Sequence, residues 1–177
     1  GKSFVSTKFG YPVFNADIEV SKLYKKNKKI FIKLNKILPK YITSFPVEKN
    51  QITRAILANN TNLKKIVNIV HKEVQKKMKS FLKNNKNKKF VILDIPLLLE
   101  NKINKKKDIL IFVESKKKDI DKRIKKRLNF NPRLLNKFKK IQFKSDYKKK
   151  KSHFILKNKF TENSVKKEIK KILNKIV

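Results

Sequence analysis

The stretch from Phe90 to Asn101 constrains the fold of this chain more than any other. Four consecutive apolar residues lead directly into Asp94, and Pro96 follows two residues later. A short continuous apolar run is typical of a strand buried on both faces of a parallel sheet, and proline cannot continue the ladder of such a strand. Because ligands bind beyond the carboxyl ends of parallel strands, the sequence predicts that Asp94 lies where a metal ion could be held beside a phosphate.

Other short apolar runs predict three further strands, at residues 11–15, 109–113 and 154–156. Apolar residues at helical spacing predict helices between them, most clearly over residues 27–38 and 63–82. Asn131 followed by Pro132 predicts another helix start, with asparagine as the N-cap and proline at the first helical position. Because strands alternate with helices along the chain, we expect an α/β fold with a parallel sheet. The length of 177 residues suits a single domain.

The formal net charge of +37 invites a nucleic-acid interpretation. However, only four of the 50 basic residues are arginines, and the lysines occur in almost every polar stretch rather than in one cluster. Arginine is the side chain suited to bidentate recognition of bases and phosphates. The composition therefore favours a solvated lysine surface and no specific nucleic-acid partner, with a basic nucleic-acid-binding protein as the alternative.

Cysteine is absent, which excludes disulfides and thiolate metal sites. No apolar run approaches the roughly 20 residues that a membrane-spanning helix needs, and the first residues show no signal-peptide pattern. We therefore expect a cytoplasmic protein without a membrane partner, present as a monomer or a weak oligomer.

The chain begins with Gly1-Lys2-Ser3, which matches the end of the phosphate-binding P-loop pattern G-x-x-x-x-G-K-[ST]. In that motif the lysine reaches the β- and γ-phosphates and the hydroxyl ligates Mg²⁺. Val5 and Phe9 predict a short helix that starts here, with Gly10 as its C-cap. An ordinary N-terminal helix is the alternative interpretation. On the P-loop interpretation, the preceding strand and the first half of the loop are missing from the chain.

Two further residues have both a functional and a structural interpretation. Asp17 follows the predicted strand 11–15, where it could accept a proton from an attacking hydroxyl or orient that hydroxyl. It could equally be an acidic residue that interacts with the dipole of the helix it begins. His71 lies at the edge of the apolar stripe of the 63–82 helix, where it could bind a ligand or make a local hydrogen bond.

Taken in order, several segments resemble dephospho-CoA kinases, the P-loop enzymes that add the last phosphate of coenzyme A. The most specific match is Asp94–Glu100, which is close to the family's D-x-P-L-L-F-E. The resemblance covers essentially the whole chain, and its other matching positions are Gly1–Ser3, Val13–Asp17, Ile69–His71, Arg123, Arg127, Gln142 and Asn158. The chain departs from the family pattern at Asn15, Lys72, Leu128 and Lys157.

The resemblance implies a P-loop kinase-like parallel sheet with helices on both faces. It also implies one domain over residues 1–177, with a helical acceptor-binding lobe at about 26–85 and a small lid at about 128–151. The family's first strand lies in the middle of a five-strand sheet. We therefore expect a gap at the centre of this sheet, and we expect residues 1–177 alone to bind ATP weakly or not at all.

The resemblance implies ATP-dependent phosphorylation of the ribose 3′-hydroxyl of dephospho-CoA, with Mg²⁺ as the cofactor. It implies two catalytic residues: Asp17, which would engage the hydroxyl, and Lys2, which would neutralise the transferring phosphate. ATP contacts are implied for Gly1, Lys2, Ser3, Phe4, Arg123, Arg127 and, near the adenine, Asn158. Acceptor contacts are implied for Asp17, His71, Asp94, Pro96 and Leu97. Ser3 would ligate Mg²⁺, and Asp94 would lie near the metal directly or through water.

Three other functions fit parts of the sequence. Another P-loop small-molecule kinase, such as a nucleotide kinase, would share the sheet and lid but would not need the segment Asp94–Glu100. A nucleic-acid-binding module would explain the charge. A non-functional remnant would explain the incomplete phosphate loop.

Overall fold

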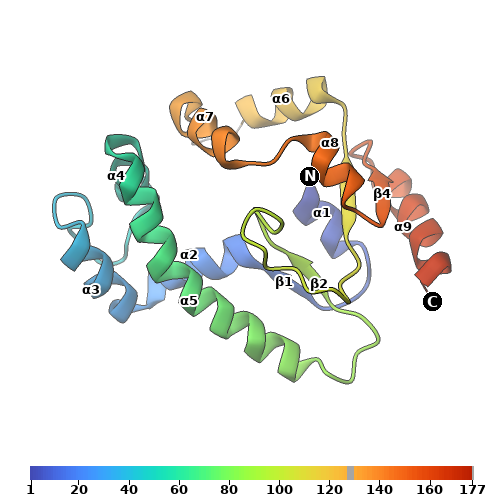
Figure 1. The fold of residues 1–177 in the computed structure, drawn as a ribbon, viewed down its shortest axis with the longest axis horizontal. Coiled ribbons are helices and arrows are strands. Elements are labelled where there is room, and N and C mark those ends of the chain that lie inside the picture. Colours follow the sequence, from blue (N-terminus) through green and yellow to red (C-terminus); the bar gives the residue numbers. More distant parts are fainter. Residues whose placement is uncertain (127–129, 177) are drawn as a thin grey trace.

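The computed structural model describes residues 1–126 and 130–176. These residues form helices and short strands, as Figure 1 shows. In chain order the elements are α1 (Lys2–Thr7), β1 (Val13–Asn15), α2 (Ala16–Lys26), α3 (Lys28–Ile37), α4 (Lys49–Ala58), α5 (Asn60–Asn84), β2 (Ile92–Asp94), β3 (Ile111–Glu114), α6 (Lys117–Lys125), α7 (Pro132–Ile141), α8 (Ser145–Lys150), β4 (Phe154–Lys157) and α9 (Glu162–Ile176). None of the described helices is long and apolar enough to span a bilayer.

Asparagine side chains begin several of the helices. They accept a hydrogen bond from a backbone N–H in the first turn of the helix, which satisfies one of its four unpaired donors. These N-caps are Asn15 for α2, Asn27 for α3, Asn59 for α5 and Asn131 for α7. The start predicted at Asn131-Pro132 is therefore confirmed, and so are the helices predicted over 27–38 and 63–82, with slightly different ends.

The strands form two parallel pairs. In the first pair Val13 of β1 faces Ile92 of β2, and Asn15 faces Asp94. In the second, Ile111 of β3 faces Phe154 of β4. Within residues 1–126 and 130–176, no backbone ladder joins β2 to β3, so the strands form two separate two-stranded sheets.

The prediction that β2 and β3 are buried on both faces is wrong. Only Asp94 of β2 is buried, and every residue of β3 is half-buried. Among the described residues, each of these strands pairs with a neighbour along one edge only, which leaves part of its backbone and side chains accessible. The prediction for Gly10 is also wrong: Lys8 is the C-cap of α1, and Gly10 adopts a left-handed φ of 75° two residues further on.

Helices α2 to α5, residues 16–84, form a helical lobe with its own apolar core. Their apolar stripes meet around fully buried side chains such as Ile30, Leu34 and Ile42. The long helix α5 packs against α2, α3 and α4 and contributes Ile66 and Val70 to this core. The lobe thus has the packing expected of amphipathic helices that share one interior.

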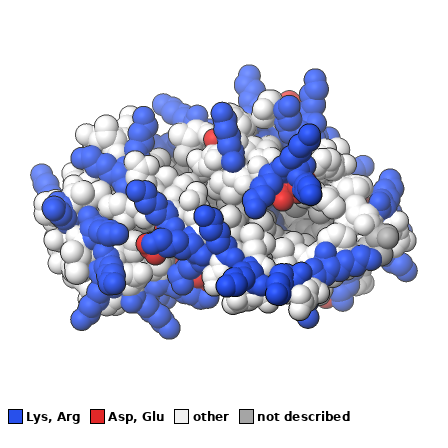
Figure 2. Space-filling view, turned by 60° about the horizontal axis from the view of Figure 1, so that its bottom comes forward, with Lys and Arg blue, Asp and Glu red and all other residues white. Residues whose placement is uncertain are grey.

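The surface outside these cores is dominated by lysine. Figure 2 shows basic side chains spread over the whole visible face, with a few carboxylates among them. This distribution follows from a chain with 50 basic and 13 acidic residues. The basic side chains are not confined to one part of this face.

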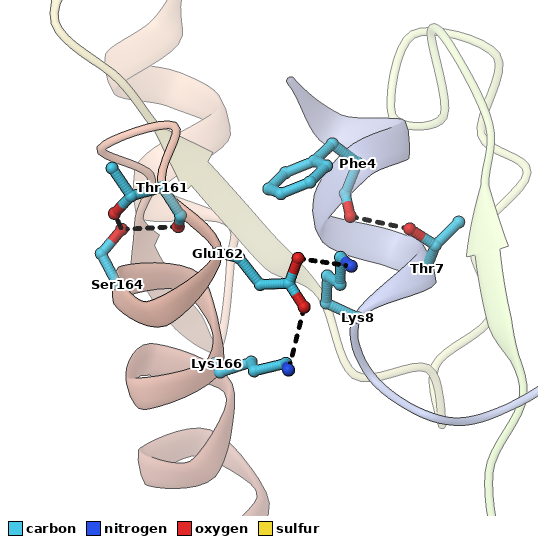
Figure 3. Close-up of polar contacts among 7 residues, drawn as sticks. All are labelled: Phe4, Thr7, Lys8, Thr161, Glu162, Ser164 and Lys166. Carbon is cyan, nitrogen blue, oxygen red and sulfur yellow. Dashed lines mark hydrogen bonds and ion pairs between the residues drawn. The ribbon is translucent and has the colours of Figure 1, made fainter.

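Helix α1 packs against both strand pairs. Val5 and Phe9 share a core with Leu156 of β4 and Val165 of α9, and α1 also contacts β1 and β2. At the surface the Lys8 ammonium lies 3.0 Å from the Glu162 carboxylate of α9. Lys166 approaches the other oxygen of that carboxylate at 2.9 Å (Figure 3). Hydrogen bonds from Lys166 and Lys8 lower the pKa of Glu162 to about 2.

We predict that Glu162→Gln makes the free energy of unfolding depend less steeply on pH at acidic pH. A carboxyl group whose pKa falls from 4.5 to about 2 on folding stabilises the protein above pH 4.5. That contribution is lost as the pH falls towards 2. Urea unfolding at a series of pH values between 2 and about 6 should therefore show a shallower pH dependence for the variant.

Glu48→Gln is the matched control, because Glu48 is exposed and forms no ion pair with the described residues. Its profile should be as steep as that of the wild type. Equal slopes for Glu162→Gln and the wild type would contradict the assigned role of Glu162.

Candidate active site

The carboxyl ends of β1 and β2 bring two polar side chains together. Asn15 donates a hydrogen bond from Nδ2 to Oδ2 of Asp94 at 2.7 Å, and Oδ1 of Asn15 accepts from the N–H of Ile18 at 3.0 Å. One side chain therefore caps α2 and also orients a carboxylate that is only 9% exposed. Since the asparagine is neutral, it engages the Asp94 side chain without adding a second carboxylate to this contact.

Beside these strand ends lies a small pocket of about 130 Å³. Four predicted acceptor residues line it: Asp17 from the first turn of α2, His71 from α5, and Pro96 and Leu97 from the loop after β2. Pockets that hold whole drug-sized ligands usually measure about 300–1,000 Å³. In the arrangement described, this pocket has room for one part of a nucleotide.

Asp17 and His71 reach the pocket in different settings. Asp17 is exposed in the first turn of α2, so its position fits the helix-dipole interpretation as well as the functional one. His71 is half-buried, and its imidazole makes no hydrogen bond with the described residues. The local hydrogen bond considered for His71 is therefore not formed among them. Asp94 is not one of the pocket's lining residues.

The residues predicted to bind phosphate begin α1. Gly1 is its N-cap, and Lys2, Ser3 and Phe4 form the first turn. The side chains of Lys2 and Ser3 are exposed, whereas Phe4 is half-buried and packs against the core between α1 and α9. The arrangement leaves a lysine and a hydroxyl accessible at the start of this helix.

Asn158, which follows β4, has a hydrogen-bonding group without a partner. The residue is 4% exposed, and its Oδ1 accepts from the N–H of Phe160 at 2.8 Å. Its Nδ2 is buried and has no partner within the described part of the chain. Leaving a buried donor unpaired costs about 1–3 kcal/mol, so this amide is a candidate to donate to a bound ligand.

Arg123 reaches the same loop. Its guanidinium carbon lies 4.1 Å from the centroid of the Phe160 ring, a cation–π contact. The structure thus brings Arg123 and Asn158 together through Phe160, a residue that sequence reasoning missed. Arg127 lies outside the described residues.

The described residues form no metal site of several histidine, cysteine or acidic ligands. Within the part of the chain that is described, no three or more histidine, cysteine, aspartate or glutamate side chains converge. A magnesium ion held by Ser3 and by Asp94 would not need such a cluster, because Mg²⁺ usually keeps several waters and takes one or two protein ligands. The donor set of one hydroxyl and one carboxylate fits that preference.

Sequence reasoning also missed the interactions of Glu100, the last residue of the segment Asp94–Glu100. Oε1 of Glu100 accepts from the N–H of Phe143 at 2.9 Å and pairs with the Lys148 ammonium at 2.7 Å. Its place at the end of the most specific matching segment was the available signal. The partners lie more than 40 residues further along the chain, so no local pattern reveals them.

Two solved structures resemble the fold closely. A protein from Thermus thermophilus superposes with a TM-score of 0.76 at 20% identity, covering 100% of this chain and 92% of the other. The dephospho-CoA kinase from Campylobacter jejuni superposes with a TM-score of 0.61 at 20% identity, covering 97% and 88%. These likenesses show the class of the fold, an α/β fold with parallel strands.

The sequence comparisons give the family. The model of the family described as dephospho-CoA kinase matches residues 1–164. The dephospho-CoA kinase of Wolbachia pipientis wMel is 30% identical over 181 residues, covering 99% of this chain and 92% of the relative. That of Rickettsia felis is 28% identical, covering 98% and 90%. The chain belongs to the dephospho-CoA kinase family, and its class of activity is that of a kinase.

We predict that Asn15→Asp destabilises the protein at neutral pH. The introduced carboxylate still caps α2, but it replaces the donor to Asp94 with a second negative charge. The expected loss is about 1–3 kcal/mol at pH 7. Like charges raise the pKa values of a carboxylate pair in the folded state, so the penalty grows with pH and disappears towards about pH 4. Urea unfolding at both pH values measures it.

Asn27→Asp is the matched control. Asn27 caps α3 in the same way, through the N–H of Ile30 at 3.1 Å, but no hydrogen bond to a carboxylate is made by its side chain within the described residues. An acidic cap at a helix N-terminus is neutral or slightly stabilising. Equal stability of the two variants at pH 7 would show that the contact with Asp94 contributes nothing.

Proposed function

We propose that this chain transfers the γ-phosphoryl group of ATP to the ribose 3′-hydroxyl of dephospho-CoA. The observation that carries the proposal is the pocket beside the ends of β1 and β2. Asp17, His71, Pro96 and Leu97 line it together, although they come from three separate parts of the chain. They are four of the five residues at which the resemblance implies acceptor contacts; the fifth, Asp94, does not line the pocket.

On the acceptor side, Asp17 is proposed as the base or orienting group for the attacking hydroxyl. The first turn of α2 supports this role, because the positive end of a helix dipole favours an ionised carboxylate there. An ionised carboxylate accepts hydrogen bonds only, which suits it to orient a hydroxyl and receive its proton. His71 and the apolar wall made by Pro96 and Leu97 would hold the ribose in place.

On the donor side, the first turn of α1 and the loop after β4 would hold ATP. Lys2 would neutralise charge on the β- and γ-phosphates, and Arg123 would contribute a second cation to the transferring group. The unpaired Nδ2 of Asn158 supports a contact with an acceptor nitrogen of the adenine ring. Phosphoryl transfer depends mainly on such positioning and charge neutralisation.

We propose Mg²⁺ as the cofactor, with Ser3 as a ligand and Asp94 as a direct or water-mediated one. When bound, the ion would neutralise negative charge between the phosphates. The hydrogen bond from Asn15 keeps one oxygen of Asp94 engaged, so the other oxygen is the one available to the metal or its water.

The test is a substrate panel. We expect ATP-dependent phosphorylation of dephospho-CoA that exceeds that of nucleoside monophosphates by about a hundredfold or more, because a site that hydrogen-bonds its substrate rejects analogues that leave its polar groups unpaired. The assay uses residues 1–177 and a version extended upstream by a β-strand and a full G-x-x-x-x-G-K-[ST] loop. A preference for nucleotides in both forms would replace this proposal with a nucleotide kinase.

We predict that Asp17→Asn, in whichever form is active, lowers kcat by a factor on the order of 10² or more while the KM for ATP changes little. The control is Glu19→Gln, the other acidic residue in the first turn of α2, which pairs with Lys22 and Lys77. Both changes remove one negative charge from the same helix end. If the two variants turn over equally fast, Asp17 is not the base.

A further inference from the structure

The loop after β2 is held in one shape by its own backbone. The N–H of Asn101 donates to the carbonyl of Leu97 at 3.0 Å, and that of Ile103 donates to the carbonyl of Leu98 at 3.0 Å. Leu97 has a left-handed φ of 55°, which a leucine adopts at a cost of about 1–2 kcal/mol. Residues 95–103, here called the pocket loop, therefore form an internally hydrogen-bonded and locally strained unit, as is frequent at functional sites.

The pocket loop has two different neighbours. Pro96 and Leu97 line the acceptor pocket. Glu100 does not line this pocket, and its carboxylate accepts from the N–H of Phe143 at 2.9 Å and meets the Lys148 ammonium at 2.7 Å. The Glu100 side chain is only 8% exposed. Burial raises its pKa, but Lys148 and the backbone N–H groups of Glu100 and Phe143 outweigh burial, so the pKa lies below its usual value.

The partners of Glu100 belong to residues 131–151, here called the lid segment, which contains α7 and α8. This segment is also fixed to the helical lobe. The Lys137 ammonium donates to the carbonyls of Ile56 and Leu57 at the end of α4, at 2.7 and 3.2 Å. Leu134 and Phe138 pack against the core of the lobe. The lid segment thus spans from the lobe to the pocket loop.

We propose that Glu100 is a positioning residue that couples occupancy of the acceptor pocket to the position of the lid segment. A ligand against Pro96 and Leu97 stabilises the pocket loop in the shape that holds the lid segment through Glu100. By thermodynamic linkage, a lid segment held by Glu100 raises the affinity of the pocket for the same ligand. This inference rests on the proposed function, because it takes dephospho-CoA as that ligand.

The carboxylate of Glu100 suits this role for a physical reason. A charged acceptor forms stronger hydrogen bonds than a neutral one, and more so where water is excluded. One carboxylate oxygen that accepts from a backbone N–H and also meets an ammonium holds the lid segment at two points. Lys149 and Glu114 form another ion pair between the lid segment and the sheet, at 2.6 Å. Glu114 lies on β3 rather than on the pocket loop, and its side chain is 34% exposed.

The test compares Glu100→Ala with Glu114→Gln as the matched control. Each variant weakens one ionic attachment of the same lid segment, but only the first involves the pocket loop. We expect Glu100→Ala to weaken dephospho-CoA binding about tenfold, within the 5- to 150-fold range usual for coupled sites, and Glu114→Gln to change it less than twofold. Titration calorimetry with dephospho-CoA gives both dissociation constants. Equal losses, or no loss with Glu100→Ala, would overturn the proposal.

Hydrogen exchange of the ligand-free protein separates this inference from the proposed function. Glu100→Ala should speed exchange both at Phe143 and across the pocket loop, whereas Glu114→Gln should leave the pocket loop unchanged. Faster exchange confined to the lid segment would overturn the coupling, whatever the ligand is. Failure of the wild type to bind dephospho-CoA, with the exchange result intact, would instead overturn the proposed substrate and keep the coupling.

Discussion

The packing of α1 is the interaction on which the rest of the structure depends. The two strand pairs share no backbone ladder within the described residues, so side-chain contacts must hold them together. Val5 and Phe9 are buried in the core that α1 shares with β4 and α9, and burial of such side chains contributes about 1.5–3 kcal/mol each. The partly exposed pair of Lys8 with Glu162 adds orientation more than energy. The packing of α1 thereby fixes the positions of Lys2 and Ser3 relative to both strand pairs.

Local structure could be predicted where its cause is local. The side chain of Asn131 caps the helix that follows it, and Pro132 suits the first helical position whatever the rest of the chain does. The apolar runs before Asp94 and at 154–156 likewise mark strands. The burial of those strands could not be predicted, because it depends on which neighbours lie along each edge. Asp94 is buried, whereas Ile111 on β3 is half-buried, although both belong to runs of similar composition.

In the candidate site, too, some features could be predicted from the sequence and others could not. The positions of Asp17, His71 and Pro96 beside one pocket agree with a pattern that motif matching could supply. The orientation of Asp94 could not be predicted, because it depends on the Nδ2 of Asn15, 79 residues away in the chain. In the sequence, Asn15 is only a departure from the family pattern. In the structure, the substitution provides a neutral donor that engages one carboxylate oxygen without adding a second charge.

The lysine excess changes how an ion pair should be interpreted in this protein. With 50 basic and 13 acidic residues, almost any glutamate has a lysine nearby, so an ion pair alone is weak evidence for a structural or functional role. The burial of the glutamate distinguishes one ion pair from another: the side chain of Glu100 is 8% exposed, whereas that of Glu162 is 46% exposed. A buried carboxylate must be compensated by hydrogen bonds and a cation, and removing one partner is costly. The field of the remaining lysines would attract any polyphosphate, so selectivity has to come from buried contacts such as those of Glu100 and Asn158.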